Sequence, residues 1–218
     1  IGAKREMDEQ NMQAFDASPA DFLDMNYFNL WDQESHELRL TTNFDGPFNF
    51  VAGLYSFEVD YTQFWDVSHL HWTYNAILGF PLFPDVTGPT SVKSQGQRQQ
   101  TDSFAAFASA DWAISERWTL TFGGRYTKEE KDFSGDNGSI GYDPAAGEPR
   151  PFDHTTWEKD AEWSEFTPSA ALRFNMTDNT MLWASYAEGF KSGGFFGRQA
   201  NFNNIDVTFE PESVQNFE

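Results

Sequence analysis

The chain has 218 residues, with 14 Lys plus Arg against 34 Asp plus Glu, which gives a formal net charge of -20. This balance argues against a nucleic-acid-binding protein, because affinity for a phosphate backbone depends on clustered Lys and Arg. The chain contains no cysteine, which excludes disulfides, thiolate metal sites and a Cys nucleophile. It also contains no run of about 18 to 20 apolar residues, the length that a membrane-spanning helix needs.

The first predicted hairpin follows a long polar segment, residues 1–33, which we assign to a loop. Over about 34–61, Leu38 and Leu40 alternate with Glu37 and Arg39, and the chain turns at residues 45–47. Alternation with a period of two is the signature of a half-buried strand. For the return strand, two sets of apolar residues compete for the apolar side. Residues 62–100 then form a second long loop.

The clearest pair of strands lies at about 101–127. Trp118, Leu120 and Phe122 fall on one face of the second strand, while Thr119 and Thr121 fall on the other. The preceding strand has the same apolar and polar faces, and only residues 115–117 separate the two. A connection this short closes an antiparallel hairpin.

A third hairpin is predicted at about 164–190, with its turn near residues 177–179. It is preceded by an acidic loop over 128–162 and followed by a loop over 191–211. A further strand begins near Glu212, so the pattern predicts six strands and the start of a seventh. Facing on the strand from 180 to 190 is left open.

The alternation of short turns with long connections separates two fold classes. Loops this long are uncommon inside compact soluble domains, whereas outer-membrane barrels combine short periplasmic turns with long extracellular loops. A tilted strand needs about 9 to 11 residues to cross a bilayer, and the predicted strands have this length. A soluble sandwich with its ring-rich face buried fits the alternation equally well, so periodicity leaves both all-β folds open.

Several strings resemble the barrel of TonB-dependent outer-membrane receptors. They are the run TDSFAAFASADW at 101–112, WTLTFGGRYTKEEK at 118–131, FTPSAALRF at 166–174, WASYAEGFKSGGF at 183–195 and FEPESVQNFE at 209–218. ESHELRL at 34–40 and GPFNFVAGLY at 46–55 are similar to the same family's middle strands. The resemblance runs in order over roughly 34–61, 101–131 and 164–218.

This resemblance implies an antiparallel transmembrane β-barrel of which the chain is an incomplete, internal part. Family members enclose a plug domain in a barrel of about 22 strands and import nutrients with energy from the TonB protein. Neither a plug nor a TonB box is seen here. We therefore expect part of a receptor for a scarce nutrient, above all a ferric siderophore, in the outer membrane of a Gram-negative bacterium. The implied partners are outer-membrane lipid, the ferric chelate, and TonB through the missing plug.

Candidate ligand contacts lie in the loop over 62–100. Trp65, His69, His71 and Trp72 combine imidazoles with rings that stack on a chelate or a sugar. Two imidazoles are too few for a closed metal site, so we assign no metal. The alternative is that these side chains simply pack within a folded loop.

Two arginines on polar faces of strands are the other candidates. Arg125 and Arg173 must point into the barrel, because a charge facing lipid near the midplane costs about 2 to 4 kcal/mol. We expect them to pair with carboxylates of the plug or of the barrel wall. The alternative is that they guide an anionic ferric chelate directly.

The main alternative function is a secreted all-β module that binds a ligand or carbohydrate through aromatic loops. An enzyme is not expected. A phosphate-binding loop needs Gly directly before its Lys and another Gly five residues earlier, and Phe190 and Ser185 stand at these positions before Lys191. Carboxylate pairs arise by chance among so many acidic residues. No cofactor is expected.

Overall fold

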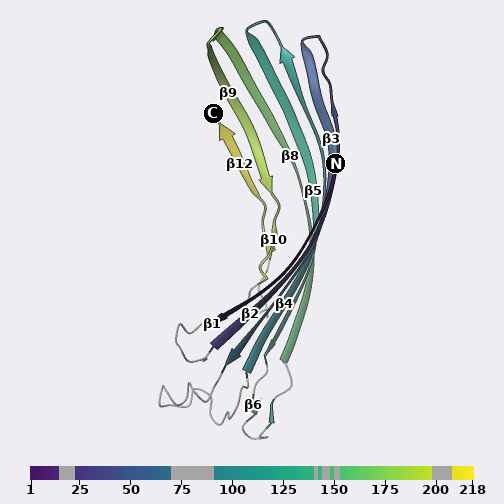
Figure 1. Cartoon of the computed structure of the whole chain (residues 1–218), viewed down its shortest axis with the longest axis vertical. Helices are drawn as coiled ribbons and strands as arrows, with labels where there is room; N and C mark the ends of the chain where they lie inside the picture. Colours follow the sequence, from purple (N-terminus) through teal and green to yellow (C-terminus); the bar gives the residue numbers. More distant parts are fainter. Residues whose placement is uncertain (15–22, 70–90, 140–141, 144–147, 150–152, 198–207) are drawn as a thin grey trace.

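In a computed structural model, the chain forms one large antiparallel sheet and two very short ones. The structure describes residues 1–14, 23–69, 91–139, 142–143, 148–149, 153–197 and 208–218. The large sheet has eight strands in the order β1-β2-β3-β4-β5-β8-β9-β12 (Figure 1). Their bounds are β1 Gly2–Ala14, β2 Leu23–Thr41, β3 Phe48–His69, β4 Ser91–Ala113, β5 Trp118–Ser139, β8 Asp153–Thr177, β9 Thr180–Lys191 and β12 Glu212–Phe217.

The two minor sheets are pairs of two-residue strands. β6 Tyr142–Asp143 pairs with β7 Glu148–Pro149, and β10 Gly194–Phe195 pairs with β11 Thr208–Phe209. Among the described residues, no helix is long and apolar enough to span a membrane.

The strands extend much further than the sequence predicts. The three expected hairpins and the strand from Glu212 are present, but β3, β4, β5 and β8 have 22, 23, 22 and 25 residues. The segments 1–33, 62–100 and 128–162, which we assigned to loops, therefore contain large parts of strands, including the whole of β1. The reason is that both faces carry polar residues there, so no apolar alternation marks the strand.

Short turns join strands at one end of the sheet, shown at the top of Figure 1. In the β2–β3 turn, Asn49 Oδ1 accepts from the amide of Phe44 at 2.6 Å, and its Nδ2 donates to the Phe44 carbonyl at 3.2 Å. In the β4–β5 turn, Ser115 Oγ accepts from the amide of Trp118 at 3.2 Å. Such side-chain bonds to the backbone substitute for ladder bonds at a reversal. We call this the short-turn end.

One face of the sheet carries a band of exposed apolar side chains beside the short-turn end. The register places Leu120 opposite both Trp112 and Leu172, and Phe122 opposite Ala110 and Ala170, all on this face. The expected facing of β4 and β5 is therefore confirmed. Other exposed members of the band are Leu38, Leu40, Leu54, Phe104, Trp118, Tyr126, Phe166 and Leu182.

The register also settles the two strands that sequence left open. On β3, Leu54 lies opposite Leu38 and Ala106 and joins the apolar band, while Tyr55 lies on the other face. On β9, Leu182 pairs with Phe174 and joins the same band. The competing apolar residues of β3 thus face the opposite side of the sheet.

The height of the apolar band matches a bilayer. From Trp112 up to Phe104 is eight residue steps, roughly 26 Å along a strand at 3.3 Å per residue. At the strand tilt of about 35 to 45° that is typical of outer-membrane barrels, this length corresponds to a height of roughly 20 Å, close to the apolar height of about 25 Å that such barrels show. Beyond the band the same face becomes mainly charged, with Glu34, Glu58, Asp60, Asp102, Glu130, Asp132, Glu158, Asp160 and Glu162.

The other face is concave, and the chain folds back into its hollow. Figure 1 shows the sheet bent along its strands, with β10 inside the bend. A single sheet has little core, and the buried apolar side chains of the described residues are Val59, Ala105, Ala110, Phe133 and Phe195. Phe133 and Phe195 meet where β10 rests on the sheet, with ring centroids 5.3 Å apart.

Candidate functional site

The candidates from the loop over 62–100 are only partly described. Trp65 lies on β3, half-buried on the concave face, opposite Tyr27 on β2 and Gln95 on β4. The backbone of His69 closes β3 opposite Ser91, but its side chain lies outside the described part. His71 and Trp72 also lie outside the described residues.

Both candidate arginines lie on the concave face, as expected. Arg125 Nε donates to Thr127 Oγ1 at 3.1 Å, and its guanidinium carbon lies 5.4 Å from the ring centroid of Tyr55 and 5.9 Å from that of Phe107. A guanidinium stacks favourably on aromatic rings at this separation. Arg173 lies near the short-turn end and donates to Thr119 Oγ1 at 3.1 Å.

The structure does not bring Trp65 and the two arginines into one site. Trp65 is level with Gln95, while Arg125 is level with Phe107, twelve residues further along β4. At about 3.3 Å per residue this is a separation of roughly 40 Å along the strand. Arg173 lies further still toward the short turns. The tryptophan and the arginines therefore cannot bind the same small ligand.

A row of amide side chains crosses the concave face beyond the apolar band. Gln97 Nε2 donates to Gln63 Oε1 at 2.9 Å, and Gln63 Nε2 donates to Asn29 Oδ1 at 2.9 Å. We call Asn29, Gln63 and Gln97 the amide row. Tyr61 also donates its hydroxyl to Asn29 Oδ1 at 3.1 Å, and Asn29 Nδ2 donates to Glu9 Oε2 at 3.1 Å. The row thus ties β1, β2, β3 and β4 together by uncharged groups ending at a carboxylate.

A second element lies over β4, β5 and β8, namely the inner strap, residues 192–197. Lys131 Nζ donates to Ser192 Oγ and to the Gly193 carbonyl, both at 2.8 Å, and lies 3.0 Å from Glu129 Oε1. Ser192 Oγ in turn donates to Glu129. The Lys131 ammonium also lies 5.6 Å from the ring centroid of Trp163. This partly buried network fixes the start of the strap to the sheet.

Glycine allows the inner strap to approach the sheet closely. A Cβ on Gly193 would lie 2.6 Å from the Trp163 ring and 2.4 Å from the Phe209 carbonyl oxygen. At its far end, the strap is held by Gln95 Nε2, which donates to the Gly197 carbonyl at 2.7 Å. The strap is therefore anchored to the wall at both ends.

Between the strap and the amide row lies a cavity of about 470 Å³. Its lining combines aromatic rings with amides and a glycine, namely Tyr61, Gln97, Gln99, Phe133, Phe195, Phe196 and Gly197. We call it the strap cavity. Rings and a few convergent polar groups are the usual lining of a small-molecule site.

Sequence reasoning missed this cavity, although part of its signal was present. Gln95, Gln97 and Gln99 alternate in the chain and so must share one face of a strand. The polar composition of 62–100 predicts a loop, and alternation has no structural meaning in a loop. The contribution of the strap carried no such signal, because Ser192 and Lys131 are 61 residues apart in the sequence.

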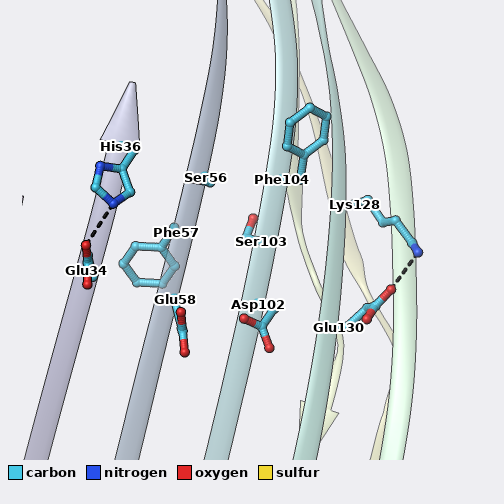
Figure 2. A pocket seen from close by; sticks show the side chains of 10 residues that line it. All are labelled: Glu34, His36, Ser56, Phe57, Glu58, Asp102, Ser103, Phe104, Lys128 and Glu130. Atoms are coloured by element: carbon cyan, nitrogen blue, oxygen red, sulfur yellow. Dashed lines mark hydrogen bonds and ion pairs between the residues drawn. The ribbon is translucent and has the colours of Figure 1, made fainter. Parts of the chain in front are cut away.

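A larger hollow, about 540 Å³, lies on the opposite, convex face just beyond the apolar band (Figure 2). Its polar side chains include His36 bonded to Glu34 at 2.8 Å, and Lys128 paired with Glu130 at 2.5 Å. The hydrogen bond to Glu130 is the main cause that raises the pKa of Lys128, and the same bond lowers the pKa of Glu130. The Lys128 ammonium of this hollow is thus paired with a carboxylate, and the hollow faces outward.

A comparison with protein families decides what this sheet belongs to. The model for the TonB dependent receptor-like β-barrel matches residues 5–218. The chain belongs to this receptor family. Its members are transport receptors and not enzymes, so the expectation of no enzymatic activity is confirmed. In the TonB-dependent barrel the concave face lines the lumen and the convex apolar band meets lipid.

Solved structures of two receptors have the same fold. The ferric yersiniabactin uptake receptor FyuA from Yersinia pestis is 16% identical, with a TM-score of 0.66, over 99% of this chain and 28% of that one. The closed form of the ferric-catecholate import receptor Fiu from E. coli K12 is 14% identical, with a TM-score of 0.52, over 99% and 34%. The chain thus spans about a third of these receptors. Comparison with curated protein sequences finds no match.

Proposed function

We propose that the chain forms part of the wall of an outer-membrane receptor that imports a scarce nutrient, a ferric siderophore, with energy from TonB. The strap cavity is the observation that carries this proposal. It is a lined hollow on the lumen side, beyond the level of the lipid, where a ligand arriving from outside meets the barrel first. Transport requires binding there and release inward, and the wall needs no catalytic group for either.

The orientation of the sheet follows from the length of its connections. We place the short-turn end in the periplasm of a Gram-negative bacterium and the opposite end outside the cell. The charged convex surface beyond the apolar band then lies above the hydrocarbon layer. On this placement, about half of each long strand projects from the membrane.

Iron is the cargo that the structural neighbours favour. FyuA and Fiu are named for the uptake of ferric yersiniabactin and of ferric catecholates. At 16% and 14% identity they share the fold, and the choice among ferric ligands rests on this chain's own residues. Among the described residues, no group of three His, Cys, Asp or Glu could hold a bare metal ion. This supports import of a chelate and not of free iron.

The earlier candidates take different places in this proposal. Trp65 lies at the level of the amide row and is a ligand-contact candidate, and His69, His71 and Trp72 remain candidates of the same kind. Arg125 and Arg173 lie at the level of the apolar band, where the lumen of a family member holds the plug. We propose that these arginines contact the plug.

A secreted carbohydrate-binding module is the weaker alternative. It would have to cover the apolar band with a second layer, and in the described part of the chain that face is bare, with Leu38 72% and Leu40 60% exposed. Extraction separates the two: the full-length receptor should partition with outer membranes and require detergent, whereas a secreted module should not.

The transport proposal is tested in cells that carry the full-length receptor as their only route for a ferric chelate. Uptake of radiolabelled iron should depend on the receptor and stop when TonB is deleted. Receptor present on the cell surface but giving the same uptake with and without TonB would contradict it.

A further inference from the structure

The pairing of β8 differs between its two sides. On the β5 side, the ladder runs without a break from Phe174 to Asp153. On the β9 side, it runs only from Thr177 to Ser169, and β9 then continues into the inner strap. Figure 1 shows β9 and β10 turning away from β8 into the bend of the sheet. In the described part of the chain, no strand pairs with β8 on this side beyond Ser169.

A proline stands where the ladder between β8 and β9 ends. In an antiparallel ladder, successive residues direct their N–H and C=O groups to opposite sides of the strand. The amide of Asn175 donates to the Arg117 carbonyl at 2.9 Å, on the β5 side. The even-numbered residues of β8 therefore direct their backbone groups toward β9. Pro168 is one of these residues and has no N–H to donate, so the pairing with β9 stops there.

Beyond Pro168, the same side of β8 is an open strand edge, which we define as residues 156–164. Its even-numbered residues, which include Glu158, Asp160 and Glu162, have exposed side chains and direct N–H and C=O groups away from β5. Such a row of backbone groups is a template for one more strand. Further strands of a barrel that follows chain order join the wall at the β1 and β12 edges. They leave this place beside β8 free.

The open edge is acidic on its convex side. Glu158, Asp160 and Glu162 occupy alternate positions there, and Asp160 lies opposite Asp132 of β5. A hollow of about 520 Å³ beside the edge includes Asp132, Glu158 and Asp160 in its lining. Like charges directly opposite each other on a sheet are unfavourable. A cationic side chain that entered the hollow would relieve this repulsion.

Cations near the edge do not cancel its charge. Lys128 Nζ lies 3.0 Å from Glu162 Oε2, on the β5 side. Arg98 Nη2 lies 3.1 Å from Asp60 Oδ1, towards β3. Lys159 is part of the edge, but as an odd-numbered residue it belongs to the concave side. A strand that adds beside β8 therefore meets a carboxylate at every second position.

We propose that the open edge binds an extended basic peptide, which adds to the sheet as one more strand. Backbone groups of the peptide pair with those of Glu158, Asp160 and Glu162. A Lys or Arg at every second position of the peptide then lies opposite these carboxylates, and cross-strand pairs of opposite charge are favourable. A second copy of this chain is not the occupant, because two such edges would oppose like charges. The site lies beyond the apolar band and is separate from the strap cavity.

The test uses the full-length receptor purified in detergent and two fluorescein-labelled peptides of about the length of the edge. The first alternates Lys with Thr and can form a strand. The second alternates Lys with Pro, carries the same charge and cannot pair as a strand. Fluorescence anisotropy at low salt, where charge attraction is least screened, measures binding. The Lys-Thr peptide should bind at least about tenfold more tightly than the Lys-Pro peptide.

Two substitutions of Asp160 separate its charge from its backbone pairing. Asp160→Asn removes the carboxylate and should weaken binding of the Lys-Thr peptide about twofold to fivefold. Asp160→Pro also removes the N–H that points to the open edge and leaves the ladder with β5 intact, so it should weaken binding about tenfold further. The matched control is Asp132→Asn, because Asp132 lies opposite Asp160 on a strand that is paired on both sides. Its affinity for the peptide should stay close to that of the wild type.

Three results would overturn the proposal. Equal binding of the two peptides would show attraction to an acidic surface without strand addition. No binding of the Lys-Thr peptide would show that other parts of the full-length receptor cover the edge. Equal effects of Asp160→Pro and Asp160→Asn would place the peptide elsewhere.

Folding of each variant is checked by the electrophoretic mobility of the unheated barrel, so a loss of binding is not mistaken for a loss of structure. If Asp160→Pro does not fold, the comparison of the two peptides on the wild type still decides. Neither Asp160 nor Asp132 lines the strap cavity. TonB-dependent uptake should therefore be unchanged in Asp160→Asn, whatever the peptide does.

Discussion

The same long strands have two different halves. On β5, the half beside the short turns alternates Leu120 and Phe122 with Thr119 and Thr121, whereas the half that begins at Lys128 carries polar or charged groups on both faces. Yet the ladder with β4 and β8 continues without a break to Ser139. The backbone pairing is thus the same in both halves, and only the surroundings of the convex face differ.

The difference shows what lipid imposes on a strand and what pairing alone requires. Within the bilayer every backbone group must be paired and the outer face must be apolar. Beyond it, pairing still satisfies the backbone, but water replaces lipid outside and removes the need for apolar side chains. The far half is held instead by side-chain contacts on the concave face, which are the amide row and the inner strap.

The difference between the two halves is tested most directly by placing the same charge on the convex face of each half. Phe122→Arg in the full-length receptor puts a cation near the middle of the apolar band and should destabilise the barrel by about 2 to 4 kcal/mol. Asp132→Arg puts it on the same face of the same strand, beyond the band, and should be nearly neutral. Urea unfolding in liposomes measures both.

Equal losses for the two variants would mean that lipid does not end between these positions. A third variant, Thr121→Arg, points into the lumen beside Phe122 and separates burial in lipid from crowding of the strand. It should cost less than Phe122→Arg. Failure of that order would refute the assignment of faces.

The two halves also explain what could be predicted from the sequence. The hairpin turns and the facing of Phe122 could be predicted from alternation, because contact with lipid requires apolar side chains on one face of the strand only. β1 and the far halves of β3, β4, β5 and β8 did not, since water on both sides leaves no pattern to read. In the candidate site, the shared face of Gln95 and Gln97 was readable, but the Lys131 contact with Ser192 was not, because it joins distant parts of the chain.

A smaller effect is expected from removing the anchor of the strap. Lys131→Met leaves Glu129 and the Gly193 carbonyl without their shared donor and should destabilise the far half by about 2 to 3 kcal/mol, within the range for hydrogen bonds to charged groups. Hydrogen exchange of the strap amides should rise while the apolar band stays protected. Lys128→Met, on the convex face, is the control and should leave the strap unchanged.

If exchange in the strap is the same in both lysine variants, the Lys131 network does not hold it. If the proposed function holds, the affinity for the chelate is a second measurement of the same effect, because the strap supplies Phe195 and Phe196 to the cavity. We expect Lys131→Met to weaken binding and Lys128→Met to leave it intact.

Two glycines covered by cross-strand rings allow a finer comparison. A Cβ on Gly135 would lie 2.2 Å from the Trp157 ring, which itself packs on Phe133 at a centroid distance of 4.5 Å. A Cβ on Gly124 would lie 2.4 Å from the ring of Phe166, which is 55% exposed. Gly135→Ala should cost about 1 to 2 kcal/mol from overpacking, and Gly124→Ala less, because Phe166 can rotate toward lipid. Unfolding midpoints rank the two, and the reverse order would show that the Trp157 side is the more adaptable.

The smallest effect concerns the exposed pair of Lys128 and Glu130 at the border of the two halves. Lys128 lowers the pKa of Glu130 below its ordinary value of 4.5, so this pair contributes stability above that pH and loses it as the pH falls through the lowered pKa. Lys128, whose pKa is raised above 10.5, stays charged throughout this range. Between about pH 7 and about pH 3, the unfolding midpoint should therefore fall slightly more, or rise slightly less, in the wild type than in Glu130→Gln. The double variant with Lys128→Met should behave like Glu130→Gln, because the partner of the mutated group is gone. A pH dependence of Glu130→Gln identical to that of the wild type would show that water screens the pair completely, and that the border between the halves carries no electrostatic contribution from it.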